Sequence, residues 1–507
     1  MSVSRLRRGP RPALGLVVGV AVVAAACAAT PLTGPNGDLR NPDVGPPGLA
    51  IVVLAGDDLS PLPSADLVVD GRSVPLDDAA TAVVPWPAAA VTVEARRPGF
   101  RPSSTVVEEY PAAGRLEFRL EPVVLVGKVS TPNGFPLPEV AVTLGGARDV
   151  SDDEGRFRIE RAVPGELELT RPAWQDVSET WDGTVEKVDV QMEPLRLRAL
   201  RVGGDAAGDP ERWKALLGLA DLSGADALVV EIKDERGTVL HDTEVARAHE
   251  IGAVEVLYDL GQIADDITAR GLYGIARISV FQDPPLARAE PDHAVGDEST
   301  GGLWTTAAGY EWLDPSDPAA YEYSIALAEE ACRRGFREIQ FDYVSYPFGG
   351  DVKNAVFDGG YTQEVRVASV VAYLERASSV LRPMGCAVGT TLLGITLESS
   401  TDEGVGQRPG PLSRVVDVLS PTLYSTNYGS GWRGFADPNA NAAEIVDGAL
   451  ASGLRKLEGA GYYRPWLQTW QIGVDGVLAV EQVAEDRGMG WMLWSNASRY
   501  DVSYLPR

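Results

Sequence analysis

From about residue 196 onward, short apolar runs alternate with helical stretches, and this alternation constrains the fold more than any other feature of the chain. Apolar runs separated by helices are typical of parallel strands joined by crossover helices. We predict eight strands, at 200–202, 227–233, 274–281, 338–343, 387–393, 416–424, 466–470 and 491–496. Eight strands between about residue 196 and the end of the chain predict a (β/α)8 TIM barrel. A doubly wound open sheet is the alternative, but no Gly-x-Gly-x-x-Gly turn follows the first strand.

Polar residues interrupt several of these runs with a period of two, so they share one face of each strand. Glu231 and Lys233 share a face of the second strand, Arg277 lies on the third, and Asp342 lies near the end of the fourth. Charges inside a barrel are costly unless they pair. The carboxyl ends of barrel strands are also where active sites lie. We therefore predict a functional pocket at that end. A structural ion-pair network, above all around Lys233 and Arg277, is the alternative.

The stretch 341–347, Phe-Asp-Tyr-Val-Ser-Tyr-Pro, resembles the Phe-Asp-Tyr-(Val/Ile)-Arg-(Phe/Tyr)-Pro motif of a glycoside hydrolase family once catalogued as a domain of unknown function. Further matching blocks follow in order at 230–234, 275–281 with 283–284, 301–304, 312–315, 420–424, 464–468 and 490–494. The resemblance implies a glycosidase-type TIM barrel with a catalytic aspartate after the fourth strand, which is Asp342 here.

Two departures from the family pattern bear on substrate choice and on catalysis. Ser345 stands where the motif has arginine, and 424–428 reads Tyr-Ser-Thr-Asn-Tyr instead of Tyr-Pro-Ser-His-Tyr. A cation and an imidazole are therefore missing from the neighbourhood of the predicted pocket.

Glycoside hydrolysis usually needs two carboxyl groups, one that protonates the leaving oxygen and one that acts as nucleophile or base. Asp342 is the first candidate, because its inward parity, its strand end and the motif agree. Candidates for the second carboxyl are Glu231, Asp234, Asp283 and Glu398. We favour Glu231, which shares the inward parity and has Lys233 or Arg277 at hand to tune its acidity. A salt-bridged core glutamate is the alternative.

Aromatic and polar residues gather near the same strand ends. The candidates for stacking on sugar rings are Tyr343, Tyr346, Trp304, Tyr424, Trp470 and Trp494. The candidates for polar contacts with a substrate are Lys233, Arg277, Asp283, Gln468 and Asn496. Aromatic residues at strand ends are also ordinary core, which is the alternative for each of them.

Two similar segments precede the barrel, and we place them at 48–122 and 123–195. Each has short alternating runs separated by Gly, Pro and Asp turns, which is typical of a small all-β sandwich. The second resembles the carboxypeptidase regulatory-like family through 126–129, 138–142, 153–157 and 163–165. A passive stalk and a module that binds carbohydrate or protein are both open as roles.

The N-terminal segment has the pattern of a targeting signal. A start with several arginines is followed by an apolar run at 13–26 that ends in small residues before Cys27. This resembles a bacterial lipoprotein signal at 1–27, with Cys27 lipidated and 28–47 as a linker. We therefore expect a lipid anchor on the outer face of the cell membrane. A plain secretory signal is the alternative.

Charge and the scarcity of metal ligands exclude other classes. Lys and Arg total 45 against 72 Asp and Glu, and the formal charge of −27 argues against nucleic acid as a partner. With three histidines and three cysteines, we expect no metal site and no cofactor. A disulfide between Cys332 and Cys386 and a buried reduced pair are both open.

Three functions compete on this basis. The first is an envelope-anchored glycoside hydrolase that acts on an extracellular polysaccharide, and the second is a non-catalytic carbohydrate-binding or scaffold lipoprotein on the same barrel. A metal-dependent deacetylase is disfavoured, because none of the three histidines sits at a confident strand end with paired ligands.

Overall fold

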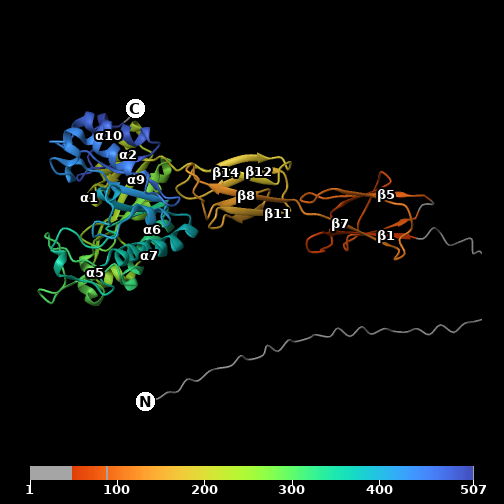
Figure 1. Cartoon of the computed structure of the whole chain (residues 1–507), viewed down its shortest axis with the longest axis horizontal. Helices are drawn as coiled ribbons and strands as arrows, with labels where there is room; N and C mark the ends of the chain where they lie inside the picture. Colours follow the sequence, from red (N-terminus) through yellow and green to blue (C-terminus); the bar gives the residue numbers. More distant parts are fainter. Residues whose placement is uncertain (1–47, 87–88, 506–507) are drawn as a thin grey trace, which may run out of the picture.

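The computed structural model describes residues 48–86 and 89–505. Figure 1 shows three bodies in a row, two small all-β bodies followed by a large body of strands and helices. The predicted signal, Cys27 and the linker at 28–47 lie outside the described residues. Over the described residues, none of the helices has the length and apolarity needed to traverse a bilayer.

The two all-β bodies consist of short strands. The first contains β1 (Gly48–Ala55), β2 (Asp66–Val69), β3 (Arg72–Val74), β4 (Thr81–Pro85), β5 (Val91–Arg96), β6 (Ser103–Val107) and β7 (Arg115–Leu120). The second contains β8 (Val124–Ser130), β9 (Ala141–Leu144), β10 (Ala147–Val150), β11 (Arg156–Glu160), β12 (Gly165–Thr170), β13 (Val177–Trp181) and β14 (Lys187–Gln191).

Both bodies are sandwiches of two sheets with the same strand order. The first combines the sheets β4-β1-β7 and β3-β2-β5-β6, and the second combines β11-β8-β14 and β10-β9-β12-β13. In each, the first and last strands pair in parallel. Their alternating apolar residues fill the space between the sheets, for example Ile51 with Val93 and Leu125 with Val142, all fully buried. The repeat in the sequence therefore corresponds to two copies of one sandwich.

The sequence Asp-Asp-Glu-Gly at 152–155 forms a tight turn between β10 and β11 in the second sandwich. The Asp152 carboxylate accepts hydrogen bonds from the backbone N–H groups of Glu154 at 3.0 Å and Arg156 at 2.8 Å. Gly155 has φ +75°, and a Cβ there would come within 2.2 Å of the Val129 carbonyl oxygen. Glycine is therefore required for the turn to pass under β8.

The large body is the predicted TIM barrel. Its strands are β15 (Arg198–Val202), β16 (Ala227–Lys233), β19 (Tyr273–Ser279), β21 (Glu338–Asp342), β23 (Ala387–Leu393), β24 (Val418–Thr422), β26 (Trp466–Gln468) and β27 (Trp491–Trp494). They pair in parallel in this order, and β15 closes the barrel by pairing with both β27 and β16. The fold class is confirmed.

Helices and short extra strands surround this barrel. The helices are α1 (Gly204–Ala207), α2 (Pro210–Ser223), α3 (Ala246–Glu250), α4 (Leu260–Ala269), α5 (Pro284–Ala289), α6 (Glu322–Arg333), α7 (Gln363–Leu381), α8 (Pro409–Ser413), α9 (Ala442–Leu454) and α10 (Gly473–Asp486). The extra strands are β17 (Val239–His241), β18 (Val254–Tyr258), β20 (Gly296–Asp297), β22 (Ala355–Val356) and β25 (Tyr462–Tyr463).

Strand register places charged residues of neighbouring strands side by side. Glu231 of β16 pairs with Arg277 of β19, and Ser279 of β19 pairs with Asp342 of β21. Because residues in register on parallel strands point to the same face, the inward charges of three successive strands meet. Sequence periodicity predicts the inward face, and the register adds which charges are neighbours.

The second sandwich packs against the amino ends of the barrel strands. Arg171 forms a buried ion pair at 2.8 Å with Asp417, which directly precedes β24, and Asp417 also contacts Arg382 at 3.2 Å. Trp174 packs edge-on against Tyr462, with ring centroids 5.7 Å apart. This contact leaves the carboxyl ends of the strands at the opposite face, away from the sandwiches (Figure 1).

A disulfide joins Cys332 of α6 to Cys386, which directly precedes β23, with 6.1 Å between the Cα atoms. Of the two states that the sequence leaves open, the structure shows the oxidised one. The bond ties α6, the helix that precedes β21, to the start of the neighbouring strand β23 at the amino end of the barrel.

Candidate active site

Asp342 ends β21 at the carboxyl face of the barrel. Its Oδ1 accepts a hydrogen bond from the backbone N–H of Tyr343 at 2.8 Å, and Tyr343 has φ +53°. This left-handed residue turns the chain sharply out of the strand. The Asp342 side chain is 13% exposed, so solvent reaches the carboxylate.

The Asp342 carboxylate opens into a cavity of about 340 Å³. The cavity is lined by Arg277, Asp342, Tyr343, Ser345, Phe348, Thr391, Leu392, Leu393, Gln407, Thr422, Tyr424, Asn427, Trp470, Trp494 and Asn496. Its volume lies within the range of ordinary small-molecule sites. Seven of the sequence-predicted site residues meet here, namely Asp342, Arg277, Tyr343, Tyr424, Trp470, Trp494 and Asn496.

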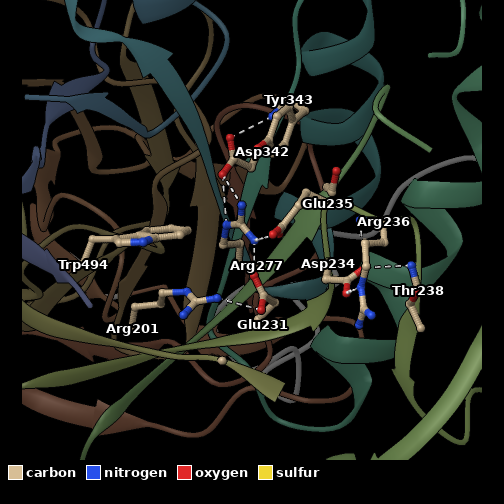
Figure 2. A network of polar contacts seen from close by, with 12 residues as sticks. Arg201, Glu231, Asp234, Glu235, Arg236, Thr238, Arg277, Asp342, Tyr343 and Trp494 are labelled. Carbon is tan, nitrogen blue, oxygen red and sulfur yellow. Dashed lines mark hydrogen bonds and ion pairs between the residues drawn. The ribbon is translucent and has the colours of Figure 1, made fainter. Parts of the chain in front are cut away.

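Arg277 links the two predicted catalytic carboxylates. Its Nη2 and Nε donate hydrogen bonds to Asp342 Oδ2 at 2.6 and 2.9 Å, and its Nη1 donates to Glu231 Oε1. Figure 2 shows the guanidinium between the two carboxylates. Burial disfavours the charge on Arg277, but Asp342 and Glu231 outweigh that effect and raise its pKa. The arginine is therefore a fixed cation at the base of the cavity.

Glu231 lies deeper than Asp342, between two arginines. Its side chain is 6% exposed, and its Oε2 accepts a hydrogen bond from Arg201 Nη2 at 2.8 Å. Arg201 and Arg277 both lie over the ring of Trp494, at 4.4 and 5.0 Å from its centroid. Glu231 does not line the cavity, and its link to the cavity is the hydrogen bond that it accepts from Arg277.

Aromatic rings form much of the cavity wall. Tyr424 meets Trp470 edge-on with centroids 5.0 Å apart, and Tyr343 stacks on Phe348 at 6.0 Å. Burial raises the pKa of Tyr424 well above its ordinary value, which keeps its hydroxyl protonated. The wall therefore offers flat apolar faces and neutral polar groups.

Lys233 and Asp283 form an ion pair away from the cavity. Lys233 Nζ lies 2.9 Å from Asp283 Oδ2 and donates a hydrogen bond to the Ser279 carbonyl oxygen at 2.6 Å. Both side chains are buried, and Asp283 also caps α5 by accepting from the Leu286 N–H at 3.2 Å. Burial raises the pKa of Asp283 against the opposing effect of Lys233. The pair therefore fixes the loop after β19, as the structural alternative for Lys233 anticipates.

Trp304, Tyr346 and Gln468 are three further predicted contacts that lie outside the cavity lining. Trp304 Nε1 donates to the Asp351 carbonyl oxygen at 2.9 Å, and the Tyr346 hydroxyl lies 3.2 Å from Ser369 Oγ. Gln468 Nε2 donates to the Trp470 carbonyl oxygen at 2.7 Å. All three are buried and hold loops in place. They are predicted as substrate contacts from their parity or motif position, but the structure buries them outside the cavity lining, as the core alternative for the aromatics has it.

The other candidates for a second carboxylate are also paired away from the cavity. Asp234 contacts Arg236 at 2.7 Å, and Glu398 accepts hydrogen bonds from Arg433. Neither lines the cavity around Asp342.

Several residues of this site are not among those predicted from the sequence. Arg201 is the one charged residue inside the first predicted strand, and that isolated charge could have identified it. Gln407, Asn427 and Phe348 lie on loops, where no periodicity marks them. Gln407 Nε2 donates to the carbonyl oxygens of Val344 and Thr391, which joins its loop to the cavity wall.

Metal ligands do not cluster in the described part of the chain, where no group of three or more His, Cys, Asp or Glu side chains could hold an ion. The side chains that line the cavity carry carboxylate, guanidinium, amide and hydroxyl groups and aromatic rings.

Solved structures similar to this chain include glycoside hydrolase domains. The domain of PgaB (BpsB) from Bordetella bronchiseptica is 14% identical, with 60% of this chain and 95% of that chain covered and a TM-score of 0.43. That of PelA from Pseudomonas aeruginosa is 12% identical, with 60% and 96% covered and a TM-score of 0.37. A hypothetical protein from Ruminiclostridium thermocellum is 30% identical, with 38% and 96% covered and a TM-score of 0.35.

A search of curated proteins finds no match to this chain. The family described as "Putative glycosyl hydrolase domain" matches residues 199–500, which is more than half of the chain and spans the barrel with its Asp342 cavity. The chain therefore belongs to this glycosyl hydrolase family.

Proposed function

We propose that the protein is a glycoside hydrolase that cleaves an extracellular polysaccharide in the cavity at the carboxyl end of the barrel. The observation that carries this proposal is the position of Asp342. It is a partly exposed carboxylate at a strand end, in a cavity walled by aromatic rings. Barrel enzymes hold their reacting groups at this face.

The cavity wall suits a sugar. Trp470, Trp494 and Tyr424 offer apolar faces to the C–H groups of a pyranose ring. Asn427 and Asn496 can donate and accept hydrogen bonds with its hydroxyl groups. This combination of flat apolar faces and neutral amides supports a glycan as the substrate class.

The carboxylate spacing is compatible with glycosidase chemistry. Asp342 and Glu231 both accept hydrogen bonds from Arg277. Because these contacts involve one planar guanidinium, the nearest oxygens of the two carboxylates lie within roughly 8 Å, in the range that glycosidases use. In the proposed reaction Asp342 faces the anomeric carbon. Glu231, the predicted second carboxylate, lies behind Arg277 and outside the cavity lining.

A non-catalytic glycan-binding protein is the second candidate, and one observation favours it. Arg277 occupies Asp342 Oδ2 with two hydrogen bonds, while Asp342 Oδ1 accepts from the Tyr343 N–H. A carboxylate engaged at both oxygens can orient a sugar without reacting with it. The two candidates differ in whether a glycosidic bond is broken.

Hydrolysis by the full-length protein separates the candidates. Reducing ends released from cellulose, xylan, starch, chitin and galactan should appear with the wild-type chain and disappear with Asp342→Asn. The control is Asp265→Asn, which changes an exposed aspartate of α4. Retained glycan binding without release of reducing ends from any polymer would favour the second candidate, and hydrolysis that survives Asp342→Asn would refute the role of Asp342.

We also propose that Cys27 carries lipid and holds the protein on the outer face of the membrane. The basic start, the apolar run and the small residues before Cys27 support this location. The disulfide between Cys332 and Cys386 fits an oxidising compartment. Cys27→Ser should release the protein from the membrane fraction in a fractionation experiment. Membrane retention of this variant would contradict the anchor.

A further inference from the structure

The loop that leaves β16 carries a carboxylate that strand periodicity does not mark. Glu235 lies two residues beyond the end of β16, and its Oε2 is 3.9 Å from Arg277 Nη1. Figure 2 shows its side chain beside Arg277, on the same side as Tyr343. One arginine is therefore approached by three carboxylates, those of Asp342, Glu231 and Glu235.

The backbone of this loop is held on both sides. The Asp234 carboxylate accepts hydrogen bonds from the N–H groups of Arg236 at 3.0 Å and Thr238 at 2.9 Å. The Glu235 carbonyl oxygen accepts one from Gln282 Nε2 at 2.7 Å. Gly237 has φ +78°, and a Cβ there would lie 2.5 Å from Asp283 Oδ1. The loop therefore positions the Glu235 side chain at the rim of the barrel mouth.

Glu235 and Glu231 differ in exposure and in hydrogen bonding. The Glu235 side chain is 42% exposed and that of Glu231 is 6% exposed. Glu231 accepts hydrogen bonds from two arginines, whereas over residues 48–86 and 89–505 no hydrogen bond engages the Glu235 carboxylate. A carboxyl that carries a proton to a substrate needs access to the substrate and a free oxygen. Among the described residues, Glu235 has a free carboxylate and is open to solvent at the rim of the barrel mouth, although like Glu231 it lies outside the cavity lining itself.

We infer that Glu235 and Asp342 are the carboxyl pair that contacts the sugar, and that Glu231 is a positioning residue that holds Arg277 between them. This inference rests on the proposed hydrolase function. Through the guanidinium of Arg277, the nearest oxygens of Glu235 and Asp342 lie within about 9 Å, which spans the separations used by glycosidases.

Each group has a defined step in the reaction. Glu235 gives its proton to the glycosidic oxygen as the bond between that oxygen and the anomeric carbon breaks. A water oxygen bonds to the anomeric carbon, and Asp342 accepts the proton that this water loses. Asp342 then releases its proton to solvent and Glu235 takes one up, so the net change is the addition of one water across the glycosidic bond.

The experiment compares Glu235→Gln with Glu255→Gln in the full-length protein. Glu255 is a matched control, because it is also an exposed glutamate near an arginine, with its Oε2 4.0 Å from Arg236 Nη2. Each variant is assayed on the polymer that the wild-type chain cleaves among cellulose, xylan, starch, chitin and galactan. The matching 2,4-dinitrophenyl glycoside is the second substrate, because its leaving group needs no proton.

We expect Glu235→Gln to lower kcat on the polymer about 100-fold or more, with KM changed less than about threefold. On the dinitrophenyl glycoside the loss should stay below about tenfold, and Glu255→Gln should match the wild type on both substrates. An equal loss on both substrates, or retention of polymer hydrolysis, would overturn the assignment of Glu235.

Failure of this assignment can be told apart from failure of the proposed function. If the wild type cleaves a polymer, Asp342→Asn is inactive and Glu235→Gln is active, only the role of Glu235 is lost. If the wild type cleaves none of the polymers or glycosides, the hydrolase function and the role of Glu235 are both refuted. Thermal unfolding of Glu235→Gln should match the wild type, because the Glu235 side chain is substantially exposed.

Discussion

The two ends of the barrel bury ion pairs of the same chemical kind, yet their surroundings differ. At the amino end, Asp417 pairs with Arg171 and Arg382 beneath the second sandwich, and its side chain is 1% exposed. At the carboxyl end, Asp342 pairs with Arg277 but faces a cavity. A buried pair that is fully covered joins two bodies of the molecule. The same kind of pair is a candidate active site when its carboxylate is accessible to solvent in a cavity.

The cavity end differs from the amino end in a second way. Its charges are joined by Trp470, Tyr424 and Trp494, whose side chains line the cavity. At the amino end the neighbouring aromatics, Trp174 and Tyr462, pack against each other and close the interface. The two ends therefore predict opposite responses to substitution, loss of activity at one and loss of stability at the other.

The largest expected effect comes from Asp342→Asn. Loss of the carboxylate that faces the sugar should lower kcat by about 10³-fold or more. Steady-state rates on the cleaved polymer, with circular dichroism to confirm folding, measure this. Asp417→Asn is the control at the opposite end, and its folded fraction should keep the wild-type kcat. A comparable loss of kcat in the control would break the contrast between the two ends.

Asp417→Asn should instead destabilise the protein. Burial raises the pKa of Asp417, but Arg382 and Arg171 outweigh that effect and lower it. Removing the charge leaves the buried Arg171 without its carboxylate and takes one of two carboxylates from Arg382, which costs about 3 kcal/mol in the free energy of unfolding. Urea unfolding followed by tryptophan fluorescence measures this. Glu458→Gln, which breaks an exposed pair with Arg414, should cost less than about 1 kcal/mol.

A buried carboxyl near the amino end predicts a dependence of stability on pH. Burial, with a smaller contribution from Glu485, raises the pKa of Glu481 from its ordinary value of 4.5 to about 9. The folded state therefore binds a proton that the unfolded state releases above pH 4.5. The contribution of Glu481 to the free energy of unfolding is most favourable below pH 4.5 and declines as the pH rises towards 9.

Glu481→Gln should remove that loss of stability. At about pH 8 the variant should be more stable than the wild type by about 1–2 kcal/mol, and at about pH 4 the two should be nearly equal. Urea unfolding at both pH values tests this, and an equal difference at both would contradict the raised pKa. Glu444→Gln, which changes an exposed glutamate of α9, serves as the comparison and should alter stability little at either pH.

The smallest expected effect is on substrate affinity. Trp470→Ala removes one aromatic ring from the cavity and should raise KM about fivefold, because a stacked ring contributes about 1 kcal/mol. Trp470→Phe should keep most of the wild-type affinity. An unchanged KM in Trp470→Ala would show that the sugar lies elsewhere in the cavity.

Much of this site could be predicted from the sequence, because its anchors lie on strands. Asp342, Arg277 and Glu231 follow the period of two on their strands, and Asp342 also sits in a motif. Gln407, Asn427 and Glu235 lie on loops, whose positions depend on contacts far away in the chain. Glu235, for example, is held by a hydrogen bond from Gln282, forty-seven residues later.

By itself, the sequence determined the barrel, the repeated sandwiches and most of the inward faces of the strands, because hydrophobic periodicity is a local property that each segment carries. Only the tertiary structure decided which charges pair and which stay open to a substrate. Lys233 and Arg277 are both predicted to be inward cations, but a register shift after Glu231 pairs Lys233 with Ile278, which lies on the opposite face to Arg277. Lys233 therefore pairs with Asp283 under a loop, whereas Arg277 pairs with Asp342 at a cavity. Strand register and loop placement set that difference, and both arise from contacts between distant segments.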